Sequence, residues 1–592
     1  MASWLIDFQD VSHEAGVSAH LRQDFARTGT LKNRMDKKFR RIMDEEPVFA
    51  FSKQFHTNLK SNSTISTETT TFTIAHVQDP VVQFAAARGL TMMRPLWGSY
   101  FPDVEGLLEF HYHDFQNAST LAATYSAQLG KDAYKSGAED YVDIVALSAR
   151  QVLGATSFSG TPDNPILFLK EISSNGNFQT VDVIFPAFPF FLYTNPRWLA
   201  YLLEPLIEHM LSGQYPRKST MHDLGAHFPN ATGHPDGNDE YMPVEECGNI
   251  LIMGLALANT LRGNSTKYGQ GENTGIFSLM AGPENGINYL DDNWSAWGAK
   301  DAQKWVDRSY SLWTQWTQYL VDFSLRPGNQ LSTDDFAGWL SLQTGLALKG
   351  IIGINAMSEL ADLTGRDVDA KFYKNISTTY IEKWEEYAIS RDKTHAKVSY
   401  NWYGSWTTLY NLYADSLLCF HLSNDSNTII KQGSLQHIFS LGSHKPKTGF
   451  VPKHIYQMQS DWYWNVRQKY GVPLDSRHLY TKTDWEFFAA AIAAPEVRAE
   501  ILELVAKWVN ETETDRPLTD LHDTEHNGGF PGPNFFARPV VGGHFAFLAL
   551  DKACGSPDLR PPPNLDVQAI LVNEMADVEG MKTPDAVHLR AL

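Results

Sequence analysis

Residues 234–258, HPDGNDEYMPVEECGNILIMGLALA, decide the fold, because a loop rich in carboxylates leads directly into a very apolar helix. Pro243 suits the first helical turn, and the residues after Asn249 are too apolar to lie anywhere but in the protein interior. Acidic side chains at the mouth of a buried helix are candidates for chemistry.

These acids also have a purely structural interpretation. Glu245 and Glu246 fall in the first helical turn, where unpaired N–H groups and the helix dipole favour anions in any protein. Asp236 and Asp239 are of a residue type that is ordinary in loops. The stretch alone therefore leaves the catalytic and the structural interpretations open.

The helical pattern extends on both sides of this stretch, from about residue 81 to residue 552. About a dozen segments, the first expected at Val81–Gly89, are joined by loops of uneven length and share no repeating period. This pattern favours a mainly α toroid of helical hairpins, in which apolar inner helices carry loops that converge on one central funnel. One β-like insert at Ile166–Ile184 interrupts the series, with a hairpin turn expected at Asn175–Gly176.

The ends of the chain differ from this helical part. Residues 1–80 read as β and irregular, with strands expected at Val48–Ser52 and Thr64–Ile74, and they are too few to close a sandwich alone. Residues 561–592 begin with three prolines and are expected to form a C-terminal tail. The predicted division is therefore residues 1–80, 81–560 and 561–592.

Composition restricts the class of ligand. The 592 residues carry a net charge of −19 without long charged runs, which argues against nucleic acid and an anionic membrane surface. No apolar run is long enough to cross a bilayer. The three cysteines fit neither a disulfide framework nor a zinc spacing. The expected partner is a small-molecule substrate, and the oligomeric state stays open.

Polar and aromatic loops before other apolar segments supply further candidate residues, namely Lys170, Trp402, Tyr480, Lys482, Asp484 and Arg538. Each also has an ordinary alternative, since Asp484 can cap a helix and Arg538 can pair with a carboxylate. No Walker loop, dinucleotide fingerprint, HExxH or GxSxG motif is present, and the histidines are scattered. The sequence therefore predicts no cofactor and no metal, and hydrolysis by side chains alone.

Long runs of the sequence resemble the fungal glutaminase A family. They are NGNFQTVDVIFPAFPFFLY (175–193), HFPNATGHPDGNDEYMPVEECGN (227–249), LYNLYADSLL (409–418), IYQMQSDWYWNVRQKYGVPLDSRHLYTKTDW (455–485) and ARPVVGGHFAFLAL (537–550). The resemblance implies an (α/α)6 toroid of six helical hairpins and hydrolysis of L-glutamine to L-glutamate and ammonia. It also implies secretion, and the recurrent N-x-S/T glycosylation acceptors of the sequence favour the same conclusion.

Two features depart from the family pattern. The first residues show no signal peptide and only a β remnant where the family has a β-sandwich, so an intracellular location stays open. Cys247 also stands where the family has Ser or Thr, so it is not nominated as a nucleophile.

The hypothesis for the chemistry assigns roles by residue type. Glu245 or Asp239 would act as general base on a water, and Lys482, Tyr480 or Lys170 would donate a proton to the oxyanion or the leaving ammonia. The residues expected to hold the substrate are Asp236, Glu246, Lys170, Asp484, Arg538 and Trp402. One alternative is glycoside hydrolysis, with Asp236 or Asp239 paired with Asp484. The other is a non-catalytic, truncated family member.

Overall fold

The computed structural model describes residues 11–41, 44–55, 70–225, 227–267, 302–421, 449–514, 516–531 and 535–553. The chain divides into two compact units. The smaller unit contains Met1–Gln78 and Phe101–Ala118, and the larger contains Asp79–Tyr100 and Ser119–Leu592. The predicted boundary at residue 80 stays a prediction, and the predicted tail lies outside the described residues.

The smaller unit is built on one antiparallel strand pair. Strand β1 (Val11–Val17) pairs with β2 (Pro47–Lys53), with Val11 opposite Lys53 and Val17 opposite Pro47. Two helices belong to it, α1 (Ser18–Thr28) and α2 (Val104–His113). The strand predicted at Val48–Ser52 is confirmed as β2. Of the strand predicted at Thr64–Ile74, residues 64–69 lie outside the described residues, and residues 70–74 form no strand.

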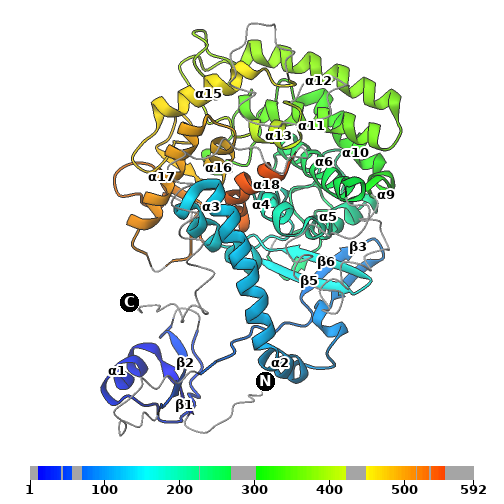
Figure 1. Ribbon diagram of the computed structural model, residues 1–592. Coiled ribbons are helices and arrows are strands. Elements are labelled where there is room, and N and C mark those ends of the chain that lie inside the picture. The colour runs from blue at the N-terminus through cyan, green and yellow to red at the C-terminus, as the bar shows by residue number, and fades with distance from the viewer. Residues whose placement is uncertain are drawn as a thin grey trace. The chain divides into compact units, whose positions relative to one another are not determined.

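The larger unit contains an inner circuit of helices (Figure 1). Its members are α4 (Val181–Thr194), α6 (Pro243–Lys267), α11 (Thr344–Leu363), α13 (Leu412–Leu417), α16 (Thr483–Ala491) and α18 (Ala546–Lys552). Each packs against the next in this order, and α18 returns to α4. Every residue of α13 and α16 is buried, as expected for helices that are apolar nearly all round.

A second layer of helices lies outside this circuit (Figure 1), and α5, α10, α12 and α17 pack directly on inner helices. It consists of α5 (Pro196–Leu211), α10 (Tyr310–Phe323), α12 (Asp367–Ala388), α15 (Lys453–Val466), α17 (Pro495–Glu511) and the later part of α3 (Phe115–Gly154), with α9 (Ala302–Arg308) beside α6. Helix α12 buries Tyr373, Ser377, Ile381 and Trp384, which recur at helical spacing on one face. The predicted toroid of helical hairpins is confirmed.

Short strands of the larger unit correct two predictions. The helix expected at Val81–Gly89 is wrong, because β3 (Val82–Ala86) and β4 (Gly89–Met93) form an antiparallel hairpin. The β-branched Val82 of this hairpin favours a strand. Phe84 of β3 packs edge-on against Phe168, which anchors the hairpin to the core.

The chain does reverse around Asn175–Gly176, where Lys170 and Phe178 form an antiparallel bridge, but this turn does not join the two strands of the insert. The hairpin strands are β5 (Thr156–Thr161) and β6 (Asn164–Leu169). Asn175 and Gly176 instead lie in a loop whose ends meet at the Lys170–Phe178 bridge. The end of the predicted insert, Val181–Ile184, is the first turn of α4.

Two further sequence expectations have an outcome. Cys419 is disulfide-bonded, which the cysteine spacing did not predict, and Cys247 is a buried free thiol. Within the described residues, no helix combines the length and apolarity that a membrane span requires.

Candidate functional site

The first turns of the inner helices, and the loops before them, carry the polar residues of the candidate site. Asp182 opens α4, Glu246 opens α6 and Asp484 opens α16. The loop before β9 (Leu521–Asp523) brings Asp520, and Arg538 directly precedes the 3-10 helix η3 (Pro539–Phe545). The unpaired N–H groups and dipole of each helix favour carboxylates here, but they do not explain why so many acids are buried together.

His222 lies at the centre of the densest group. Its Nε2 is 3.5 Å from Asp182 Oδ1, 3.8 Å from Glu246 Oε1 and 3.7 Å from Glu240 Oε2. We call Asp182, His222 and Glu246, with Glu240 at their edge, the His222 cluster. The first three are buried, and the Glu240 side chain keeps 33% of its exposure.

A second layer of hydrogen bonds fixes His222. Its Nδ1 lies 2.7 Å from Asp223 Oδ2, and His234 Nε2 lies 2.8 Å from the other oxygen of that carboxylate. The backbone N–H of His222 donates to Asp239, which also accepts from the Tyr215 hydroxyl at 2.9 Å. The ring is therefore held with Nε2 directed towards the acids.

Burial and charge shift the protonation of this cluster. Burial alone would lower the pKa of His222, but hydrogen bonds and charge from Asp182 and Asp223 raise it well above its usual value. Burial, and then the charges of Asp182 and Glu245, raise the pKa of Glu246. Burial, with Asp335 and Asp182, raises the pKa of Glu240 to about 7 against the opposing charge of His222.

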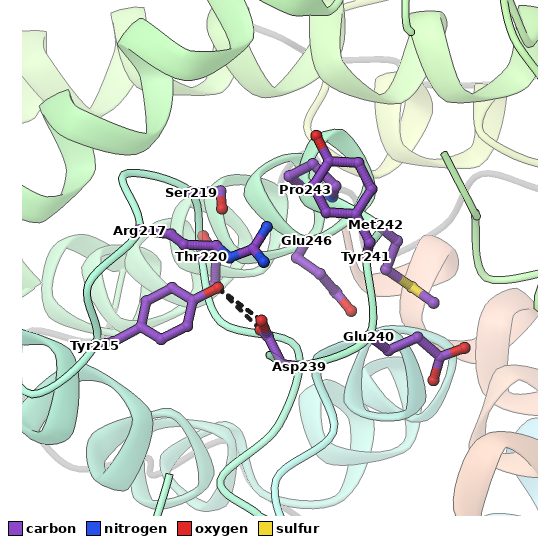
Figure 2. A pocket seen from close by; sticks show the side chains of 10 residues that line it. All are labelled: Tyr215, Arg217, Ser219, Thr220, Asp239, Glu240, Tyr241, Met242, Pro243 and Glu246. Carbon is purple, nitrogen blue, oxygen red and sulfur yellow. Dashed lines mark hydrogen bonds between the residues drawn. The ribbon is translucent and has the colours of Figure 1, made fainter. Parts of the chain in front are cut away.

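A small pocket adjoins the His222 cluster (Figure 2). Its lining is Tyr215, Arg217, Ser219, Thr220, Asp239, Glu240, Tyr241, Met242, Pro243 and Glu246. Glu240 and Glu246 belong to both the pocket and the cluster, so these two carboxylates connect the two. Arg217 supplies a cation at the pocket, 5.4 Å from the centre of the Tyr241 ring.

A second charged group lies around Lys482 at the end of β8 (Tyr480–Lys482). Lys482 Nζ is 3.2 Å from Asp484 Oδ2 and 3.9 Å from Asp520 Oδ2, and Arg538 Nη1 is 3.6 Å from the same Asp520 oxygen. All four side chains are buried. We call them the Lys482 cluster.

The two clusters act on each other electrostatically. Burial would raise the pKa of Asp182, but His222 and then the charges of Arg538 and Lys482 lower it. The charges of Lys482 and Glu245 also both act on the carboxylate of Asp334, so the 234–249 and 480–484 stretches contribute to one charged region.

The structure gives two of the predicted carboxylates other partners. Glu245 is buried and forms an ion pair with the equally buried Lys349, while Asn249 donates to it at 3.2 Å. Asp239 holds Tyr215 and the His222 backbone, as described above. The Tyr215 hydroxyl reaches both oxygens of Asp239, at 3.1 and 2.9 Å, so this carboxylate serves to position the loop.

The remaining predicted residues lie apart from these contacts. Asp236 is exposed and accepts from the backbone and side chain of Asn238. Tyr480 stacks on His478, with ring centres 4.4 Å apart, and the Lys170 ammonium lies 5.6 Å from the centre of the Phe228 ring. The Trp402 side chain is 44% exposed on a loop.

Sequence reasoning missed Asp182, His222 and Glu240. Asp182 is the one charged residue in the otherwise apolar 181–194 segment, and that contrast is a signal for a buried functional acid. His222 stood in a polar loop, and nothing in its sequence neighbourhood placed it beside α4 and α6.

Six inner helices and an outer layer define a six-helical-hairpin protein, with a polar pocket between the first turn of α6 and the loops at 215–220 and 239–242. The sequence agrees with this class. A family model described as "Glutaminase A six helical-hairpin domain" matches residues 138–271, 295–434 and 442–548. A second family model, a domain of unknown function, matches residues 2–132.

Two curated relatives extend the comparison. The chain is 64% identical over 575 residues to a probable glutaminase of Arthroderma benhamiae, covering 92% of this chain and 66% of that protein. It is 41% identical over 552 residues to Glutaminase A of Aspergillus oryzae, covering 92% of this chain and 69% of that protein. The chain belongs to the glutaminase A family, and it spans about two thirds of the length of these relatives.

Proposed function

We propose that this protein hydrolyses the side-chain amide of L-glutamine to L-glutamate and ammonia. The observation that carries the proposal is the pair Glu240 and Glu246, which line a small pocket and also contact the buried His222. The names of both relatives support the choice of an amide substrate. The sequence resemblance supports the same choice.

Glu240 is the best placed general base. It lines the pocket and is partly exposed, so its carboxylate can contact a water beside a bound substrate. In the proposed reaction Glu240 takes a proton from this water, the resulting hydroxide attacks the amide carbon, and Glu240 returns the proton to the leaving ammonia. This role replaces the predicted assignment to Glu245 or Asp239, because those carboxylates already have the partners described above.

The neighbouring groups serve binding and electrostatics. The imidazole of His222 lies between Asp182 and Glu246. A positive charge at this position would stabilise the oxyanion that forms on the amide oxygen. Arg217 at the pocket pairs with the substrate α-carboxylate through its planar guanidinium. Lys482 and Arg538 are buried, so their proposed role is to balance the acids rather than to touch substrate.

One observation favours glycoside hydrolysis as a second candidate. Tyr241 of the pocket stacks on Trp339 with ring centres 5.9 Å apart, and Trp339 is an exposed residue. Exposed flat rings beside a polar pocket are also suited to a sugar.

An assay with two substrate classes tests the proposal. Purified protein is expected to release ammonia from glutamine and no sugar from a panel of aryl glycosides. Glu240→Gln should lower kcat/KM for glutamine by at least about 100-fold. Asp236→Asn, which alters an exposed carboxylate of the same stretch, should leave it unchanged.

Two results would count against this account. Sugar release without ammonia would favour the glycosidase, and silence in both arms would favour a non-catalytic protein. Full turnover by a folded Glu240→Gln variant would remove Glu240 as the base.

A further inference from the structure

We propose that Asp182, His222 and Glu246 bind one divalent transition-metal cation, of the class of Zn²⁺ or Mn²⁺, and leave a further coordination position open towards Glu240 and the pocket. The binding itself does not depend on the glutaminase reaction. Only the catalytic use of the cation, as the positive charge that faces the amide oxygen, rests on the proposed function.

The spacing of the ligand atoms fits a single ion. His222 Nε2 and one oxygen each of Asp182 and Glu246 all lie within 4.8 Å of one another. Two ligands about 2.1 Å from a tetrahedral zinc ion lie about 3.4 Å apart. The distances from His222 Nε2, 3.5 Å to Asp182 and 3.8 Å to Glu246, therefore need only a small contraction, and the two carboxylate oxygens, which lie within 4.8 Å of each other, need to approach by up to about 1.4 Å.

One of these oxygens has no other partner. Glu246 Oε1 is buried and accepts no hydrogen bond, although the other oxygen of Glu246 accepts from Asn249 at 3.2 Å. The Glu246 side chain is 1% exposed. A buried carboxylate oxygen directed at a histidine nitrogen, without a hydrogen bond of its own, is explained by a bound cation.

The second layer around His222 is that of a metal-binding histidine. Such a histidine commonly donates its remote N–H to a carboxylate, which fixes the tautomer and the ring orientation. His222 Nδ1 lies 2.7 Å from Asp223, and Asp223 is held in turn by His234 and by the Gly225 backbone N–H at 2.6 Å. This arrangement directs Nε2 towards Asp182 and Glu246.

The ligand types narrow the choice of ion. One imidazole nitrogen with two carboxylate oxygens suits Zn²⁺ or Mn²⁺, whereas Ca²⁺ prefers oxygen ligands only. The sequence analysis predicted no metal, because the sequence has no HExxH motif and its histidines are scattered. Asp182, His222 and Glu246 are far apart in the chain, so their sequence positions did not point to a shared site.

Metal titration of the whole protein tests the site. Protein treated with a chelator and then dialysed is titrated with Zn²⁺ and, separately, Mn²⁺, with stoichiometry and affinity measured by calorimetry and the metal content by mass spectrometry. We expect one equivalent to bind with either ion. Glu246→Gln and Asp182→Asn should weaken binding at least about 100-fold, and Asp223→Asn about 10- to 100-fold. The control Asp236→Asn should bind as wild type does.

The outcomes are separable from those of the glutaminase assay. Folded wild type that binds no ion, or variants that bind as tightly as wild type, would overturn the metal site. The positive charge between Asp182 and Glu246 would then be that of a protonated His222. Stoichiometric binding lost in Glu246→Gln, without any ammonia release by wild type, would support the site and contradict the proposed function.

Discussion

Neighbouring residues of the same type acquire different roles through their surroundings. Glu245 and Glu246 are adjacent in the same helical turn and equally buried, yet Glu245 is paired with Lys349 while Glu246 contacts His222. The sequence could predict that acids gather at this turn, but not which one is neutralised. The deciding partners, Lys349 and His222, come from α11 and from the 215–225 loop.

The buried side chain of His522 predicts how the stability of the fold depends on pH. It is buried, stacks on Trp508 with ring centres 3.9 Å apart, and its Nε2 lies 2.9 Å from the Tyr470 carbonyl oxygen. Burial lowers its pKa to about 4, against about 6.5 in an unfolded chain. Below about pH 6.5 the unfolded chain therefore binds a proton that the folded protein does not. This stabilising contribution, up to about 3 kcal/mol, is lost as pH falls from about 6.5 to about 4.

Urea unfolding at several pH values measures this effect. Wild type should lose stability over that window more steeply than His522→Gln, which keeps a donor for the Tyr470 carbonyl. Identical slopes for the two proteins would show that His522 is not the group responsible.

At the scale of elements, apolarity predicted α6 but not α4, and it failed for short segments. The helix expected after Pro243 was predicted from its apolar run, and the structure has it as α6, whereas the first residues of α4 were assigned to a β-like insert. Val81–Gly89 is too short for periodicity to separate a helix from a strand, and pairing with β4 decides for the strand. Asp182 lay in the segment expected to be a β-like insert and was not selected as a candidate.

The junction of α4, α16 and η3 yields a prediction about packing. A Cβ on Gly543 would lie 2.7 Å from Asp484 Cβ and 3.2 Å from the Pro186 carbonyl oxygen. Gly543→Ala should therefore push these elements apart and lower the free energy of unfolding by about 1–3 kcal/mol. Gly404 has no heavy atom within 4 Å of such a Cβ, so Gly404→Ala should change stability by less than about 0.5 kcal/mol. Equal stability of the two variants in chemical denaturation would contradict this close contact.

At the scale of the larger unit, a closed circuit of helices brings distant parts of the chain to one site. Long apolar helices and uneven loops predicted the toroid, and the family resemblance predicted the six hairpins. The detailed site could not be predicted, because the sequence does not give the register in which each helix end meets its neighbours. Lys482 and Arg538 were both selected from the sequence and do lie together, whereas Trp402 and Asp236 were selected on the same grounds and are exposed.

The central claim is that the 234–249 and 480–484 stretches act together in one catalytic region. It is tested most directly by kcat/KM for ammonia release from glutamine in wild type, Glu246→Gln, Lys482→Met and the double variant, each verified as folded by circular dichroism. Groups that act as one unit show strongly non-additive losses. The double variant should therefore be about as slow as the slower single variant. Losses that multiply independently, or full activity of folded Lys482→Met, would contradict the claim.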